Sequence, residues 1–147
     1  MKYNLACGND RNNLKLKDYI HLDKKELDLN KDFKLKDCDK IRLAHILEHF
    51  DNEDVILKRC HNTINEKGII QIFTPSINFG MFHKQPVHYK DYFYSLSTDN
   101  KRSDELCNIF DVVYQKGHID LKRKYYRFRN WFLNILYDEW EYVLRKK

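Results

Sequence analysis

A short apolar segment that ends in small residues opens the chain, and this feature constrains the fold most strongly. Residues 3–8 read Tyr-Asn-Leu-Ala-Cys-Gly, and a second short apolar segment, residues 19–22, leads directly to Asp23. A small-residue turn after a strand lets a ligand come close to the backbone, and an acidic residue after the next strand can accept hydrogen bonds from a ribose. The pairing is therefore typical of nucleotide-type cofactor binding at the carboxyl ends of parallel strands.

Length and composition predict one globular domain. The chain has 147 residues, of which 42% are hydrophobic and 33% charged, and we interpret residues 1–147 as a single domain. No apolar stretch is long enough to span a bilayer. The four scattered cysteines contain no Cys-x-x-Cys pair, so they predict neither a disulfide framework nor a zinc ribbon. Because Met1 leads directly into a strand pattern rather than a signal peptide, we expect a cytoplasmic protein with reduced thiols.

The first half of the chain alternates strand patterns with one helical pattern. The connection Asn9–Lys17 is shorter than a usual parallel crossover, so we expect a first helix trimmed to a turn or two. Asp51 is the expected N-cap of a helix over residues 52–65, and Lys67-Gly68 is its expected end. The expected strands are residues 2–6, 19–22, 27–29 (the tip of a third strand), 40–44 and 69–73.

The second half has a different pattern. Residues 99–108 predict a helix, and residues 110–115 and 140–144 predict two late strands. Two strands without an obvious long helix between them favour an antiparallel pair at the sheet edge. The expected fold class is therefore α/β: a Rossmann-like, open, mostly parallel sheet with helices on both faces, a trimmed first helix and an antiparallel C-terminal edge pair.

Five pieces of sequence follow one another in a recognisable order. They are Asn4-Leu5-Ala6-Cys7-Gly8-Asn9-Asp10, Ile20-His21-Leu22-Asp23 with Asp28-Leu29, Asp39-Lys40-Ile41, His45-Ile46-Leu47-Glu48-His49-Phe50, and Lys67-Gly68 through Thr74-Pro75. This set resembles the class I S-adenosylmethionine-dependent methyltransferases, and more narrowly their small, methyltransferase type 11-like members. The resemblance covers residues 3–75, and it identifies residues 1–75 as a cofactor-binding half. Residues 76–147 would form an acceptor and lid half.

The resemblance implies S-adenosyl-L-methionine as the cofactor and a methyl-transfer reaction on an acceptor of unspecified class. In this family the first loop lies under the methionine moiety, an acidic residue binds the ribose, and residues after it flank the adenine. The implied cofactor-binding residues are Asn4, Ala6, Cys7 and Gly8 in the first loop, Asp23 at the ribose, Asp28 and Leu29 at the adenine, and Ala44 and His45 after the fourth strand.

Two histidines are candidate general bases. His88 follows Pro86 in a region that often covers the acceptor in this fold, and His45 follows the fourth strand. The competing interpretation of the His88 region is a packed lid. Residues 45–49 also spell H-x-x-E-H, a zinc signature that needs both histidines on one helix. Because we expect His45 at a strand end, we predict no metal site.

A basic and aromatic stretch, Lys122–Arg129, has two interpretations. Cations interleaved with aromatic side chains suit phosphate contact and base stacking, which would make nucleic acid a partner. The same stretch also fits an amphipathic helix, because Tyr125, Phe128 and Phe132 recur at helical spacing. The sequence does not specify the oligomeric state.

Three departures from the family pattern motivate a second hypothesis. Ala6 stands where the family has its first glycine, Asn4 stands where an acidic residue is common, and the first helix is short. The alternative function is a catalytically weak or inactive methyltransferase-like domain that acts as a binding or scaffold unit. Cofactor binding distinguishes the two hypotheses, because a ligand of the folded state raises its melting temperature.

Overall fold

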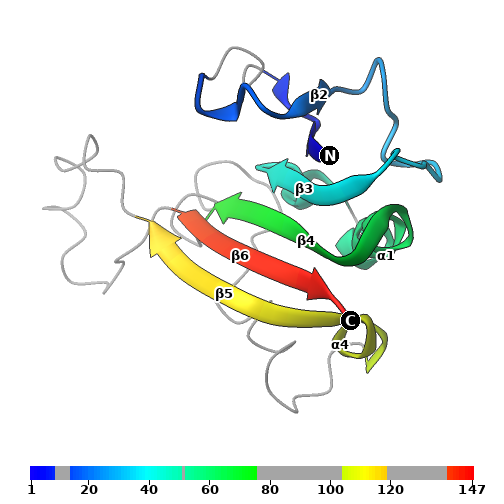
Figure 1. Cartoon of the computed structure of the whole chain (residues 1–147). Helices are drawn as coiled ribbons and strands as arrows, with labels where there is room; N and C mark the ends of the chain where they lie inside the picture. Colours follow the sequence, from blue (N-terminus) through cyan, green and yellow to red (C-terminus); the bar gives the residue numbers. More distant parts are fainter. Residues whose placement is uncertain (9–13, 51, 76–103, 119–138) are drawn as a thin grey trace, which may run out of the picture.

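The computed structural model describes residues 1–8, 14–50, 52–75, 104–118 and 139–147. Its strands are β1 (Lys2–Leu5), β2 (Ile20–Leu22), β3 (Cys38–Ala44), β4 (Ile64–Pro75), β5 (Phe110–His118) and β6 (Glu139–Lys146). Its helices are α1 (Glu53–Thr63) and α4 (Asp104–Ile109), with short 3-10 turns η2 (Leu14–Leu16) and η3 (Leu47–His49). The six strands form one sheet in the order β2-β1-β3-β4-β6-β5 (Figure 1).

The sheet is parallel in its first part and antiparallel at its C-terminal edge. β1 pairs in parallel with both β2 and β3, and β3 pairs in parallel with β4. β6 is antiparallel to both of its neighbours, β4 and β5. The expected Rossmann-like mixed sheet with an antiparallel C-terminal pair is confirmed.

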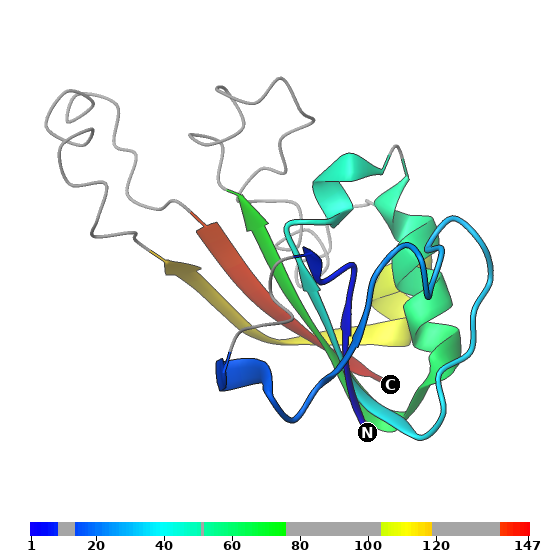
Figure 2. The same ribbon diagram turned by 90° about the horizontal axis from the view of Figure 1, so that it is seen from above.

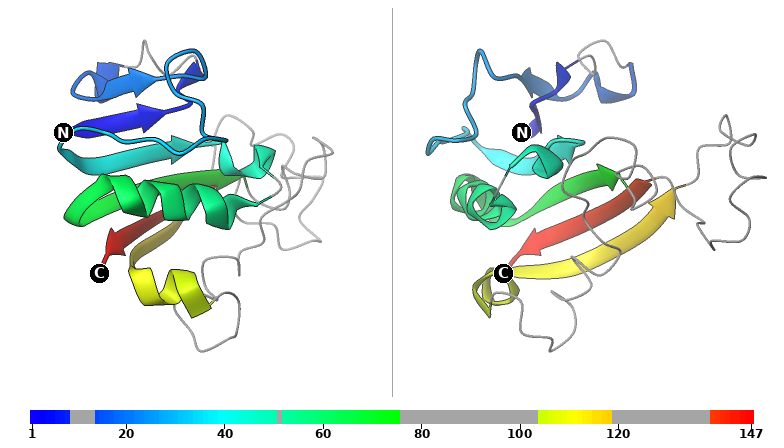
Figure 3. Two further views of the ribbon diagram at one scale, coloured as in Figure 1. Left: turned by 90° about the vertical axis from the view of Figure 1, so that its right-hand side faces the viewer. Right: turned by 180° about the vertical axis from the view of Figure 1, so that it is seen from behind.

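The strands alternate apolar and polar residues, so one sheet face forms the core. In Figure 3 the helix α1 lies across this face, and Figure 2 shows α1 and α4 on the same side of the sheet, with η2 on the other side. The His61 and Phe110 rings meet edge to face, 5.2 Å between centroids, and join α1 to β5. The most deeply buried apolar strand residues are Leu5, Cys38, Ile41, Leu43, Ile70, Ile72, Tyr142 and Leu144. Both ends of the described chain therefore contribute to one hydrophobic cluster.

Helix α1 is shorter than its sequence pattern. Its N-cap is Asn52, whose side chain accepts a hydrogen bond from the Val55 N–H, so the expectation of Asp51 as the cap was wrong. The helix ends at Thr63, because Ile64 is already extended. Lys67-Gly68 does not end the helix and lies inside β4, where the ladder with β3 changes register.

The third strand expected at residues 27–29 is also wrong, since no strand forms there. The Leu27 N–H donates to the Asp23 carbonyl, and the Asn30 N–H donates to the Asp28 carboxylate at 3.0 Å. Acidic side chains that accept backbone N–H groups favour turns over a strand ladder. Leu27 and Leu29 still pack against the core, which explains the strand-like apolar alternation.

The expectation of a trimmed first helix stays a prediction, because residues 9–13 lie outside the described residues. The described part of the connection between β1 and β2 contains the three-residue 3-10 turn η2 and no α-helix. The helix expected at residues 99–108 corresponds to α4, although residues 99–103 lie outside the described residues. Across the described ranges, no helix has the length and apolar character needed to cross a membrane.

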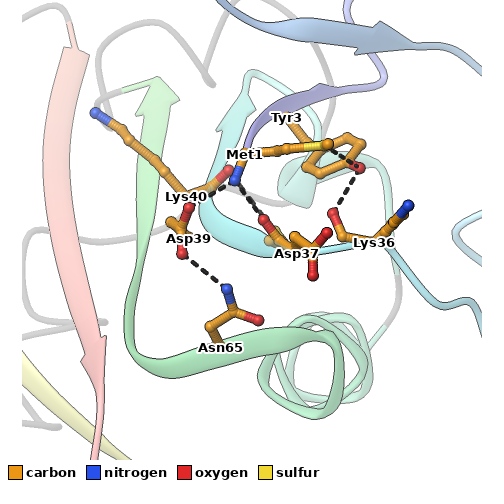
Figure 4. Close-up of polar contacts among 8 residues, drawn as sticks. Met1, Tyr3, Lys36, Asp37, Asp39, Lys40 and Asn65 are labelled. Carbon is orange, nitrogen blue, oxygen red and sulfur yellow. Dashed lines mark hydrogen bonds and ion pairs between the residues drawn. The ribbon is translucent and has the colours of Figure 1, made fainter.

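The start of the chain is tied to the amino ends of β3 and β4. The Met1 ammonium donates to the Asp37 carbonyl and, at 2.6 Å, to the Asp39 carboxylate (Figure 4). The other oxygen of Asp39 accepts from the Asn65 amide at 2.7 Å. The hydrogen bond from the ammonium, and then that from Asn65, lower the pKa of Asp39 below its usual value.

Candidate functional site at the carboxyl ends of the strands

The strand order reverses at β1. Its neighbours on either side are β2 and β3, and all three run in parallel. Chain segments that leave their carboxyl ends therefore depart in opposite directions, which opens a crevice where α/β folds bind ligands. The residues that follow these ends are residues 6–8 after β1, Asp23 after β2 and His45 after β3.

The loop after β1 turns through the left-handed region. Ala6 has φ 51° and Gly8 has φ 44°, with the buried Cys7 between them. A Cβ atom placed on Gly8 would meet no heavy atom of its surroundings within 4 Å in the described structure. The backbone at Gly8 thus borders open space, while Cys7 anchors the loop beneath it. A non-glycine residue in this region costs about 1–2 kcal/mol, so Ala6 is a strained position.

The end of β3 has the same backbone feature. His45 has φ 52°, and its N–H donates to the Phe73 carbonyl at 2.9 Å. Its side chain is 49% exposed, whereas Ala44 before it is half-buried. Two adjacent strands, β1 and β3, therefore each lead into a left-handed residue at the same edge of the sheet. Such strained positions persist where the surrounding structure holds them, and they concentrate at functional sites.

Asp23 is held in a defined orientation after β2. Its Oδ1 atom accepts the Lys24 N–H at 2.8 Å, and its own N–H donates to the Glu26 carboxylate at 2.9 Å. The side chain is half-buried. A carboxylate has about four acceptor sites, so one backbone hydrogen bond leaves capacity for a diol.

Asp28 and Leu29 lie in the turn that follows. The backbone N–H of Asn30, and then its side-chain amide, lower the pKa of Asp28 by hydrogen bonding to the carboxylate. Leu29 is 5% exposed and belongs to the core cluster. Its carbonyl accepts from Arg59 Nη1 at 2.9 Å, which ties this turn to α1. The Leu29 side chain thus serves packing, and Asp28 serves the turn.

Asn4 lies on the opposite, polar face of the sheet and is 1% exposed. Arg42 Nη1 donates to its Oδ1 at 3.2 Å, and its Nδ2 lies 3.2 Å from His21 Nδ1. Because an arginine only donates, the amide nitrogen must face His21 and donate to Nδ1. The His21 Nε2–H then donates to the Leu16 carbonyl at 3.1 Å, which fixes η2 to the sheet. The Asn4 side chain is therefore engaged within the protein.

The sequence patterns did not identify His21 and Arg42 as partners of Asn4. A signal existed in the register, since Asn4 lies opposite His21 on β2 and opposite Arg42 on β3. Residues that are opposite one another on adjacent strands share a sheet face. That register could be inferred only once the strands were aligned.

Glu48 is buried behind His45. It lies in η3 and is 3% exposed, and its Oε1 atom is 3.7 Å from His45 Nδ1. Its Oε2 atom is buried and has no hydrogen-bond partner in the described residues. A buried acceptor without a partner costs about 1–3 kcal/mol, and more when it is charged. The H-x-x-E-H segment spans a strand end and a 3-10 turn, and the described residues contain no group of three or more potential metal ligands.

Two predicted functional regions lie outside the described residues. They are His88, the second candidate base, and Lys122–Arg129, the candidate nucleic-acid segment. Both stay predictions.

No protein-family profile matches this chain, and no curated protein sequence matches it. Solved structures do match. The N-methyltransferase NodS from Bradyrhizobium japonicum, in complex with S-adenosyl-L-homocysteine, aligns with a TM-score of 0.60 and 9% identity over 99% of this chain and 76% of its own. A putative sarcosine dimethylglycine methyltransferase from Galdieria sulphuraria gives 0.60 and 10% identity over 98% and 77%. A S-adenosylmethionine-dependent methyltransferase from Archaeoglobus fulgidus gives 0.57 and 17% identity over 99% and 85%.

This chain has the class I methyltransferase fold. The resemblance that residues 3–75 carry in their motifs is thereby confirmed at the level of the fold. The alignment with NodS covers 99% of this chain and so reaches beyond the half in which the motifs lie. At these identities the comparisons establish architecture, so activity must be argued from the side chains and backbone at the strand ends.

Proposed function

We propose that this chain binds S-adenosyl-L-methionine in the crevice beyond β1, β2 and β3 and transfers its methyl group to an acceptor. One observation carries the proposal: the turn Ala6–Gly8 lies at the reversal of strand order, with Asp23 after one neighbouring strand and His45 after the other. This arrangement combines an open backbone, a carboxylate and an ionisable ring at one edge of the sheet. The structural similarity to methyltransferases supports the same function.

The residues present fit this cofactor in two respects. The backbone at Gly8 borders open space, which suits close approach of a ligand to the loop. Hydrogen bonds with Lys24 and Glu26 orient Asp23, and its carboxylate can accept hydrogen bonds from the two hydroxyls of a ribose. When bound, the cofactor supplies a methyl group already activated by its sulfonium charge.

The proposed roles differ from residue to residue. The loop from Asn4 through Ala6 and Cys7 to Gly8 would hold the methionine moiety through its backbone, since the Asn4 side chain is engaged by His21 and Arg42. Ala44 and His45 would border the cofactor at the end of β3. Asp28 would contribute by keeping its turn beside the adenine, and Leu29 by packing beneath it.

The protein's main contribution would be alignment and exclusion of water, because the methyl group needs no further activation. A base is required only for an acceptor atom that carries a proton, and we assign that role to His45 within the described residues. His88 stays a second candidate base.

Isothermal titration calorimetry with S-adenosylhomocysteine, the demethylated product, tests the proposal. Asp23→Asn removes the charge at the ribose, which should weaken binding roughly tenfold to hundredfold, because a hydrogen bond to a charged group contributes about 1.5–3 kcal/mol. Asp18→Asn is the matched control, since Asp18 is an exposed carboxylate before the amino end of β2. Equal affinities for the two variants, or no binding by the wild-type protein at millimolar ligand, would refute the proposal.

A further inference from the structure

We infer that Glu48 is the positioning residue of His45: its buried carboxylate holds the ring with the proton on Nδ1 and leaves Nε2 as the base. The inference rests on the proposed function and deepens it, because it specifies how the ring at the end of β3 is prepared. It also indicates the class of acceptor that the site would serve. The observation behind it is that the buried carboxylate of Glu48, with one oxygen that lacks a hydrogen-bond partner, lies beside the half-exposed imidazole of His45.

The direction of the contact supports this role. His45 and Glu48 are three residues apart, and His45 Nδ1 lies 3.7 Å from Glu48 Oε1. The Glu48 side chain is 4% exposed and that of His45 is 49% exposed, so the carboxylate lies on the protein side of the ring. A carboxylate at this separation already favours a proton on the nearer nitrogen, Nδ1, over one on Nε2, so the pair needs no bound ligand to select the tautomer.

The backbone around the pair is held firmly. The His45 N–H donates to the Phe73 carbonyl, which ties the residue to β4. Turn η3 is closed by hydrogen bonds from His49 to Ile46 and from Phe50 to Leu47, and Leu47 is 1% exposed. The backbone positions of His45 and Glu48 are therefore fixed relative to each other, as they must be if one residue is to orient the ring of the other.

A purely structural role does not explain Glu48. A buried carboxylate that serves packing alone would be expected to satisfy both of its oxygens, whereas Oε2 has no partner in the described part of the chain. The carboxylate therefore has the environment of a group that is retained for its effect on a neighbour.

The consequence concerns the acceptor. A carboxylate that accepts from Nδ1–H fixes the neutral tautomer whose lone pair is on Nε2. That nitrogen can take a proton from a hydroxyl or an ammonium group, and the electron pair of the broken bond stays on the acceptor atom. The resulting imidazolium is stabilised by Glu48. The dyad would thus serve acceptors that arrive protonated, rather than thiolates or carboxylates.

Long-range proton–nitrogen NMR of the nitrogen-labelled full chain, recorded without cofactor at a pH where the ring is neutral, tests the inference. The His45 signals are assigned among the seven histidines by their loss in His45→Gln. We expect the Nδ1–H tautomer in the wild-type protein. In Glu48→Met the ratio of Nδ1–H to Nε2–H should fall about tenfold or more, because the acceptor is lost. Glu53→Met, in the first turn of α1, is the control and should leave the ratio unchanged.

The melting temperature of Glu48→Met distinguishes a positioning role of Glu48 from a role in packing. Glu48→Met fills a similar volume and removes an incompletely bonded charge, so it should melt at the same temperature as the wild type or higher. An Nε2–H tautomer in the wild-type protein overturns the inference without any variant, as does an unchanged tautomer in Glu48→Met. Because no cofactor is present, a failure of cofactor binding in calorimetry would refute the proposed function and leave this result standing.

Discussion

Replacement of Ala6 by glycine should reveal the strain stored in the loop after β1. Ala6 has φ 51°, and a left-handed L-residue costs about 1–2 kcal/mol, which glycine would relieve. Glycine also makes the unfolded chain more flexible, at a cost of about 0.5–1 kcal/mol. Loss of the half-buried methyl group costs roughly 0.4 kcal/mol, half of the value for a fully buried group. The net change in the free energy of unfolding should therefore lie near zero.

The matched control is Ala44→Gly, at the end of β3. Ala44 is half-buried like Ala6, and it is not among the described residues with positive φ. Glycine at position 44 relieves no strain, so only the two costs remain: the more flexible unfolded chain and the lost methyl group. Ala44→Gly should therefore lower the free energy of unfolding by about 1.2 kcal/mol. The two variants should thus differ by about 1–2 kcal/mol in urea unfolding measured by circular dichroism. Equal losses of stability in both variants would show that the Ala6 backbone is not strained.

Two further predictions concern Asp39 and the buried cysteines Cys38 and Cys60. The pKa of Asp39 is lowered in the folded protein, so its contribution to stability is present above the unfolded value of 3.8 and is lost as the pH falls through the lower folded value. Asp39→Asn should therefore have a lower melting temperature than the wild type at pH 7, and this difference should narrow below about pH 4. The neighbouring Asp37→Asn is the control and should melt like the wild type at both pH values. A difference in melting temperature that does not change with pH would contradict this. Burial raises the pKa of Cys38 to about 11 and also raises that of Cys60, so iodoacetamide at pH 8 should modify these two thiols only in urea. Mass spectrometry of peptides measures the modification. Rapid modification of the folded protein would show that the two thiols are accessible.

The strands were predictable where apolar and polar residues alternate against a common core. β3, β4 and β6 each alternate in this way, and β3 and β6 were each expected within two residues of their observed bounds. β4 begins at Ile64, five residues before its expected start at Ile69. The segment Leu27–Leu29 alternates equally well but forms a turn, because Asp23 and Asp28 accept the backbone hydrogen bonds that a strand would need. The periodicity of apolar residues predicts which side chains face the core, but it does not predict which groups the backbone forms hydrogen bonds with.

The candidate site was predictable only in its positions along the chain. Gly8, Asp23 and His45 follow strand ends, and parallel strands bring such positions to one edge. The engagement of Asn4 by His21 and Arg42 depends on strand register, which a single sequence does not display. The burial of Glu48 likewise depends on how η3 folds back against the core.

An NMR titration of the full chain with S-adenosylhomocysteine tests most directly whether the cofactor binds at the carboxyl ends of β1, β2 and β3. Binding there should shift the amide signals of residues 6–8, Asp23 and His45. It should leave the amide of Asp39, at the opposite end of the sheet, unchanged. The absence of shifts at millimolar ligand, or shifts centred on the amino ends of the strands, would contradict the claim that this crevice is the cofactor site.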